Sequence, residues 1–230
     1  MGDRCENNET ICLQFEDVVF RNKYVRSYIN DATAEFFKNH LNHHDPLALC
    51  SLIHILHQVN RGEGSVSVGN YLNLVNDCED ALQQYNHEVY TPLSVSTISR
   101  FIQKKDFDLI HTLINIKRTY GFKFILCSDA PLAYCVAVFK AMHVSLFDLF
   151  DFRHMYTSDL VRCLKSNIRF FEYIEEELHN SRRPLQFIGD DPSGLSTNHH
   201  LDENHWNVSS LTSPEEIYAY LLDKGTKGIR

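Results

Sequence analysis

The sequence has no excess of positive charge and no apolar run long enough to cross a bilayer. Its formal net charge is -8 at pH 7. Proteins that bind nucleic acid usually carry a basic surface that neutralises phosphates, so this balance argues against nucleic acid as a principal partner. No segment approaches the roughly 18 consecutive apolar residues of a spanning helix, so no membrane span is expected.

Paired cysteine motifs and an N-terminal targeting segment are absent as well. The seven cysteines are scattered, odd in number and contain no Cys-x-x-Cys pair, which argues against a disulfide framework and a zinc knuckle. The first ten residues are polar and acidic, unlike a secretory signal or a transit peptide. The sequence therefore predicts a protein of the cytoplasm or another reducing intracellular compartment.

The first half of the chain combines one strand pattern with several helical ones. The 230 residues are 43% hydrophobic and 23% charged, enough for one sizeable core with a smaller attached unit. An apolar strand is predicted over residues 11–20. Several helices are predicted after it, with an irregular polar segment at 86–92 between two of them. These helices are predicted over residues 24–41, 46–59, 68–82, 94–104 and 107–120.

From residue 123 onward, strands and helices alternate. An apolar run ends in Ser128 and precedes a helix that reaches about Met142; a short aromatic and acidic segment covers 147–152. Further elements are predicted as a helix over 167–179, strands over 185–188 and 206–208, and a helix opened by Ser213 as its cap.

This order predicts an α/β fold, a doubly wound parallel sheet with a helical cap inserted after the first strand. We expect a core of residues 11–22 and 106–224, a cap of residues 23–105, and flexible termini at 1–10 and 225–230.

Polar side chains follow three of the predicted strands. They are Gln14, Glu16 and Asp17; Ser128 and Asp129; and Asp190 and Asp191, with Lys165 between the last two groups. The carboxyl ends of parallel strands meet at one edge of a sheet, so these groups are expected to lie together. Carboxylates, a hydroxyl and a lysine there would suit Mg²⁺ and a phosphoryl group. Taken singly, each is more typical of a turn, a helix cap or a solvated charge.

Four segments, in this order, resemble the motifs of the haloacid dehalogenase-like (HAD) superfamily, and most closely its pyrimidine 5′-nucleotidase-like branch. They are residues 124–133, 143–148, 163–170 and 187–191. The third segment has Ser166 where the family usually has proline. The resemblance implies that Ser128 and Lys165 grip a phosphoryl group and that Asp190 and Asp191 help bind Mg²⁺.

The first motif of that family is altered in this chain. Gln14 stands where the family has its nucleophilic aspartate, and Glu16 where it has the acid/base aspartate. A carboxamide cannot form an aspartyl-phosphate, and its loss of charge weakens the implied Mg²⁺ site. Glu16 is one methylene too long for a position that is sensitive to displacements of about 1 Å. A shifted register would spoil the inward and outward faces of the strand.

These departures predict a catalytically inactive phosphatase fold that serves as a binding or structural protein. A protein partner and a small phosphate ligand are the expected partners, and a subunit of a larger assembly is as consistent with the sequence as a free protein. The alternative is a residual or altered magnesium-dependent phosphatase or nucleotidase for a small phosphate ester, using Glu16 or Asp17 with a metal-activated water. A separate transition-metal site is a weaker hypothesis, with ligands at His199, His200, Asp202 and His205.

Overall fold

A computed structural model describes residues 10–41, 79–165, 167–178, 185–189, 206–209, 211 and 213–227. Several predictions lie outside these residues. They are the helix at 46–59, all of the 68–82 helix except its last four residues, the pair Asp190 and Asp191, and the histidine-rich loop at 199–205.

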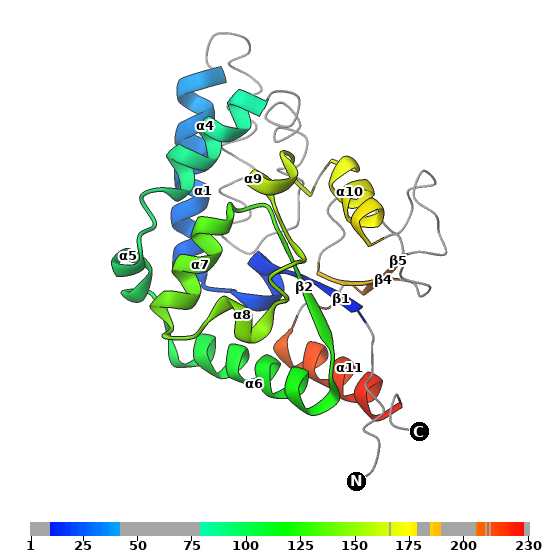
Figure 1. Ribbon diagram of the computed structural model, residues 1–230. Helices are drawn as coiled ribbons and strands as arrows, with labels where there is room; N and C mark the ends of the chain where they lie inside the picture. The colour runs from blue at the N-terminus through cyan, green and yellow to red at the C-terminus, as the bar shows by residue number, and fades with distance from the viewer. Residues whose placement is uncertain are drawn as a thin grey trace.

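Five parallel strands form one sheet in the order β3-β2-β1-β4-β5 (Figure 1). Their bounds are Thr10–Gln14 (β1), Lys123–Ser128 (β2), Met155–Thr157 (β3), Leu185–Ile188 (β4) and Trp206–Ser209 (β5). The first strand is central, and its last residue, Gln14, pairs with Cys127 of β2. The predicted α/β class with a parallel sheet is confirmed.

Helices cover both faces of the sheet (Figure 1). The described ones are Lys23–Leu41 (α1), Glu79–Tyr90 (α4), Val95–Ser99 (α5), Lys104–Tyr120 (α6), Leu132–Ala141 (α7), Leu146–Leu149 (α8), Ser158–Val161 (α9), Arg169–Glu177 (α10) and Pro214–Lys227 (α11). Between β1 and β2 the described residues contain helices and turns and no strand. This agrees with a helical cap inserted after the first strand, while its boundaries remain a prediction.

The alternation of side chains along β1 divides the core into two layers. Ile11 and Leu13 belong to a large cluster shared with α6, α7 and α11, whereas Cys12 points to the other face. There it packs with Phe170 and Phe171 of α10. Because successive residues of a strand face opposite ways, one apolar run serves both layers.

The helix ends follow the local chemistry of the sequence. Ser213 accepts a hydrogen bond from the Glu216 amide at 3.1 Å, and the Glu216 carboxylate accepts one from the Ser213 amide at 3.1 Å. This reciprocal capping box confirms the predicted start of the last helix. Gly121 ends α6 with a φ of 72°, the left-handed conformation that glycine adopts without steric penalty.

The structure corrects three sequence predictions. The first strand stops at Gln14, because Phe15–Val19 forms one π-helical turn (η1), in which the Phe20 amide donates to the Phe15 carbonyl at 2.9 Å. Helix α4 continues to Tyr90 through the segment predicted to be irregular. The short edge strand β3 was not predicted.

The short helices also differ from prediction. The helix predicted over 94–104 is shorter, since α5 ends at Ser99 and α6 begins at Lys104 behind a capping box between Gln103 and Asp106. The aromatic and acidic segment at 147–152 begins within the helical turn α8.

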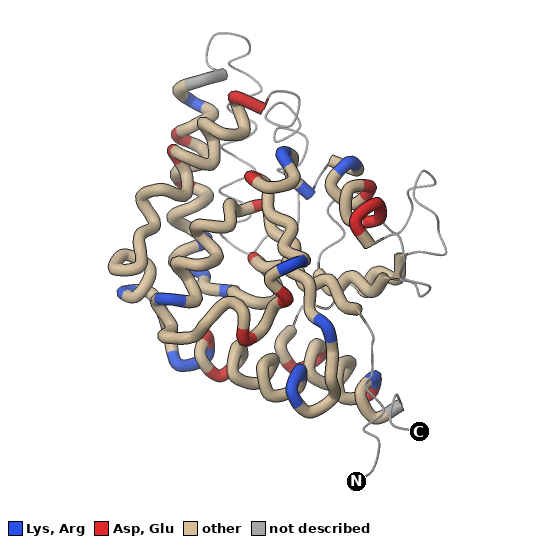
Figure 2. Tube along the Cα trace, in the orientation of Figure 1, with Lys and Arg blue, Asp and Glu red and all other residues tan. Residues whose placement is uncertain are grey.

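Charged residues of both signs are interspersed along the described chain (Figure 2). Acidic residues gather along α10, while Lys and Arg are distributed over several helices. Among the described residues, no helix combines the length and apolar character that crossing a bilayer requires.

Candidate functional site

The π-helical turn η1 carries Glu16 over the carboxyl edge of the sheet. The turn follows β1 directly and is packed by Phe15, Val18 and Val19, all fully buried. With these apolar side chains facing the core, Glu16 keeps a partly exposed side chain, 21% accessible, on the side of the cleft. π-Helical turns are rare in proteins and are frequently found at functional sites.

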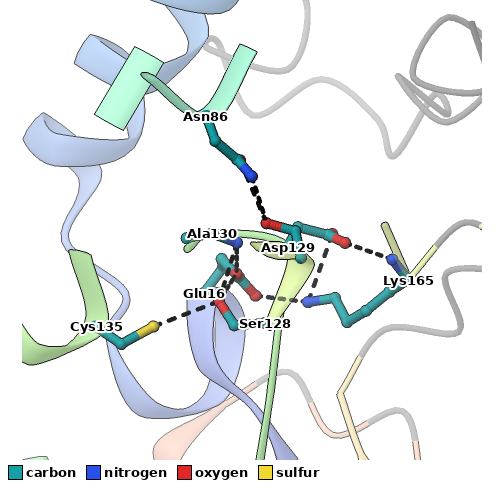
Figure 3. A network of polar contacts seen from close by, with 8 residues as sticks. Glu16, Asn86, Ser128, Asp129, Ala130, Cys135 and Lys165 are labelled. Atoms are coloured by element: carbon teal, nitrogen blue, oxygen red, sulfur yellow. Dashed lines mark hydrogen bonds and ion pairs between the residues drawn. The ribbon is translucent and has the colours of Figure 1, made fainter. Parts of the chain in front are cut away.

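Two donors from the end of β2 bind one oxygen of the Glu16 carboxylate (Figure 3). The Ser128 hydroxyl donates to Oε1 at 2.5 Å, and the Ala130 amide donates to the same oxygen at 3.1 Å. The Ala130 amide also lies 3.0 Å from Ser128 Oγ, and the Cys135 thiol donates to that oxygen at 3.5 Å. The Ser128 hydroxyl therefore accepts from the Ala130 amide and the Cys135 thiol while it donates to the Glu16 carboxylate.

Lys165 binds the other oxygen of Glu16. Its Nζ lies 2.5 Å from Glu16 Oε2 and 3.6 Å from Asp129 Oδ2, and its side chain is completely buried. The Lys165 backbone amide donates to Asp129 Oδ1 at 2.6 Å. Asp129 therefore binds the backbone of Lys165 as well as facing its ammonium group, which fixes the approach of the lysine to Glu16 (Figure 3).

The structure brings Glu16, Ser128 and Lys165 together as the sequence predicted. Gln14 lies one residue before η1 at the end of the central strand and is only 5% exposed. Its side chain packs on Gly189, where an added Cβ would come within 2.2 Å of Gln14 Oε1 and 2.5 Å of Gln14 Cβ. Because residue 189 is glycine, the Gln14 side chain can occupy the space that a Cβ at position 189 would take.

A cleft of about 250 Å³ opens above this cluster, with Glu16 and Asp129 among its lining residues. The α1 and α4 helices supply another part of the lining, including the rings of Tyr85 and Tyr90. The Tyr85 hydroxyl and Thr33 Oγ1 are 3.2 Å apart, which connects the two helices. The helical insertion thus closes over the strand ends.

The charges of the cluster shift the two carboxyl groups in opposite directions. Burial raises the pKa of Glu16, but the charge of Lys165 and the hydrogen bonds from Lys165 and Ser128 outweigh it and hold the pKa below its ordinary 4.5. Burial raises the pKa of Asp129 above its ordinary 3.8, and the charge of Glu16 adds to this while Lys165 opposes it. Glu16 is therefore the better compensated carboxylate of the two.

Burial also keeps the phenols of the cleft protonated. It raises the pKa of Tyr85 to about 12, and the charges of Asp129 and Glu16 act in the same direction. Burial likewise raises the pKa of Tyr90 well above its ordinary value. Both side chains can therefore act as hydrogen-bond donors at neutral pH.

Glu16 and Asp129 do not by themselves form a site for Mg²⁺. An ammonium group already lies close to the two carboxylates, 2.5 Å from Glu16 and 3.6 Å from Asp129, and would repel a dication placed there. Within the described residues no group of three or more His, Cys, Asp or Glu side chains is arranged to hold a metal ion. The expected ligands Asp190 and Asp191, and the four candidate ligands at 199–205, lie outside those residues.

Sequence reasoning missed two contributors to the site. The backbone amide of Ala130 has no signature in the sequence, because every non-proline residue carries such a donor. Asn86 forms a hydrogen bond with Ser158 at 3.1 Å, so α4 is joined to α9 beside the cleft. The pattern Leu82, Tyr85, Asn86, Val89 on α4 has helical spacing and could have revealed this helix.

No protein-family model matches the chain, and no curated protein matches it. Among solved structures, the chain is similar to CbbY from Rhodobacter sphaeroides in complex with phosphate, with 12% identity, 89% of this chain and 87% of that chain covered, and a TM-score of 0.49. It is also similar to the HAD-hydrolase YfnB from Bacillus subtilis bound to magnesium, with 15% identity, coverages of 93% and 98%, and a TM-score of 0.47.

A third similar structure is the HAD phosphatase from Thermococcus onnurineus, with 17% identity, coverages of 93% and 97%, and a TM-score of 0.42. The chemistry of the site therefore rests on its own side chains.

Proposed function

We propose that this chain is a catalytically inactive HAD-like protein, a pseudophosphatase that acts by binding rather than by phosphoryl transfer. The observation that carries the proposal is the residue at the end of the central strand. Gln14 is buried there, and its carboxamide is uncharged and a poor nucleophile toward phosphorus. A covalent phosphoryl intermediate on this residue is therefore not available.

The state of Glu16 supports the same function. An acid/base group works best with a pKa near the working pH, whereas the pKa of Glu16 is held below 4.5. Its carboxylate also accepts hydrogen bonds from Ser128, Ala130 and Lys165, so both of its oxygens are engaged within the protein. Glu16 is poorly suited to donate a proton to a leaving group.

The cleft bounds the size of the ligand that belongs to this proposal. Its volume of about 250 Å³ limits the occupant to a small molecule. A small phosphate compound, as expected from the pyrimidine 5′-nucleotidase-like resemblance of the sequence, is the ligand class that we propose. A protein partner, met either by the free protein or within a larger assembly, is the second part of the proposal.

The proposal is tested by restoring the family residues. The parent and the double variant Gln14→Asp with Glu16→Asp are assayed side by side on p-nitrophenyl phosphate with Mg²⁺. We expect no turnover by the parent and measurable turnover by the double variant, with a difference of about a thousandfold or more because the chemical step needs the nucleophile. Adding Lys165→Met to the double variant should abolish its activity, which excludes a contaminating phosphatase.

Turnover by the parent above that of its own Lys165→Met variant would contradict the proposal. It would instead indicate the alternative left open by the sequence, a residual phosphatase that uses Glu16 or Asp17.

A further inference from the structure

Three hydrogen-bond donors of different origin converge on the Glu16 carboxylate (Figure 3). The Ser128 hydroxyl and the Ala130 amide bind Oε1 at 2.5 and 3.1 Å, and Lys165 Nζ binds Oε2 at 2.5 Å. A hydroxyl, a backbone amide and an ammonium group are the donors that proteins aim at phosphate and carboxylate oxygens. The cluster therefore has the composition of an oxyanion-binding site.

The donors are held in place independently of Glu16. Ser128 and Lys165 are both fully buried, and the Lys165 amide donates to Asp129 at 2.6 Å. Ser128 ends the buried strand β2, and the Ala130 amide also lies 3.0 Å from Ser128 Oγ. Removing the Glu16 carboxylate would therefore leave three oriented donors, one of them a buried cation whose remaining counter-charge, Asp129, lies 3.6 Å away.

The length of the side chain at position 16 decides whether its own carboxylate can reach the three donors. An aspartate in the same turn would withdraw its carboxylate by about one carbon–carbon bond, roughly 1.5 Å. Since the contacts are 2.5 Å long at Ser128 and Lys165, such a retreat would break them. The extra methylene of Glu16 is what lets this carboxylate reach the donors.

We propose that the Glu16 carboxylate is the resident occupant of an oxyanion-binding site formed by Ser128, Ala130 and Lys165, and that it excludes small external oxyanions from these donors. The inference rests on the proposed function: it explains why no phosphoryl group reaches these three donors, so the small phosphate ligand proposed for the cleft would lie away from Ser128 and Lys165. With Glu16 and Asp129 facing one lysine, a further anion would add repulsion as well as compete for the donors.

Removal of the resident carboxylate and its replacement by a free one tests the inference. In Glu16→Ala, acetate has the atoms that the substitution deletes, a carboxylate with one attached carbon. We expect acetate, compared with chloride at equal ionic strength, to raise the melting temperature of this variant by about 4 °C at ten times its dissociation constant. Titration calorimetry should give saturable binding of acetate, and inorganic phosphate should compete with it.

Three matched proteins complete the experiment. The parent and Glu16→Gln should show no difference between acetate and chloride, because the glutamate or glutamine at position 16 is long enough to accept from the donors itself. The double variant Glu16→Ala with Lys165→Met should lose the acetate effect, since the charged donor is gone. Equal responses of Glu16→Ala to acetate and chloride, or acetate binding by the parent as tight as by Glu16→Ala, would overturn the inference.

If Glu16→Ala does not fold in chloride, its refolding yield in acetate gives the same readout, with Glu16→Ser as a second short variant. Recovery in acetate alone supports the inference, whereas equal recovery in both salts, or none in either, overturns it. The outcome is separate from the activity assay. An inactive parent whose Glu16→Ala variant ignores acetate contradicts the occupied site and leaves the pseudophosphatase proposal standing.

Discussion

Lys165 carries its charge at a position where none of its side chain reaches solvent. Such a cation depends on its partners, because desolvation of an unpaired charge costs several kcal/mol. Glu16 and Asp129 supply the compensation, at 2.5 and 3.6 Å. The pair of Lys165 and Glu16 is therefore a structural element as well as the centre of the site.

A double-mutant cycle measures this pairing. We expect Lys165→Met to lower the free energy of unfolding by about 3 kcal/mol, because it leaves two carboxylates facing each other without their cation. The double variant with Glu16→Gln should be less destabilised than the sum of the single variants by about 1–3 kcal/mol. Urea denaturation at pH 7 gives the four values.

The control for this cycle is Lys140→Met on the exposed face of α7, which should change stability by no more than about 0.5 kcal/mol. Additive effects of Lys165→Met and Glu16→Gln would show that the two side chains do not stabilise each other.

At this scale the sequence predicted which residues meet but not how they meet. Gln14, Glu16, Ser128 and Lys165 were identified from motif positions, and three of the four form one cluster. The path of η1 brings the Glu16 carboxylate, rather than an external ligand, into contact with the three donors. The sequence predicted that the strand continues through this stretch to Phe20, because the turn is packed with the same apolar residue types as a buried strand.

Among the elements, the start of α1 and the start of α6 are joined through Asn22. Its side-chain oxygen accepts from the amides of Tyr24 and Val25 at 3.1 and 3.2 Å, which makes it the N-cap of α1. Its side-chain nitrogen donates to the Phe101 carbonyl at 2.6 Å and to the Asp106 carboxylate at 2.9 Å. The two chain segments that enter and leave the helical insertion are thus held by one buried side chain.

The substitution Asn22→Asp separates the cap from this connection. Aspartate is as good an N-cap as asparagine, so a purely local role predicts little change. We expect instead a loss of about 2 kcal/mol or more at pH 7, because the donor is removed and two buried carboxylates, at 22 and 106, then face each other. Thermal or urea unfolding measures the loss.

The matched control is Ser94→Asp at the exposed N-cap of α5, where the Ser94 hydroxyl accepts from the Thr97 amide at 3.3 Å. This change should be neutral or slightly stabilising, since a negative charge favours a helix N-terminus. Equal effects of the two substitutions would contradict the connecting role of Asn22.

Elements with strong periodicity were predicted well, and those defined by tertiary contacts were not. The long helices α1 and α6 and the strand β4 lie close to their expected positions. The last turn of α4 reads as polar and irregular because its buried face uses Tyr85, Asn86 and Tyr90 rather than aliphatic residues. The strand β3 has three residues and exists through its pairing with β2, which no local pattern specifies.

For the whole molecule, the parallel sheet brings Glu16, Ser128 and Asp129 to one edge beside Lys165, so the titration of these carboxyl groups is coupled to global folding. The two carboxyl groups act with opposite signs. For Glu16 the folded-state pKa lies below 4.5, so its stabilising contribution is present above that pH and is lost as the pH falls. For Asp129 the folded-state pKa lies above 3.8, so its ionisation destabilises the fold as the pH rises from there.

These signs predict how two variants depart from the parent across pH 3 to 7. The stability gap between the parent and Glu16→Gln should be widest near neutral pH and should narrow as the pH falls below 4.5, because the parent then loses its charged contact with Lys165. Relative to the parent, the free energy of unfolding of Asp129→Asn should increase as the pH rises above 3.8. The asparagine oxygen can still accept from the Lys165 amide, and the variant avoids the cost of a partly buried charge. Urea unfolding of the three proteins at each pH measures both gaps. A gap for Glu16→Gln that stays constant from pH 7 to pH 3 would contradict the pairing of this carboxylate with Lys165, and with it the charge balance on which the closed site depends.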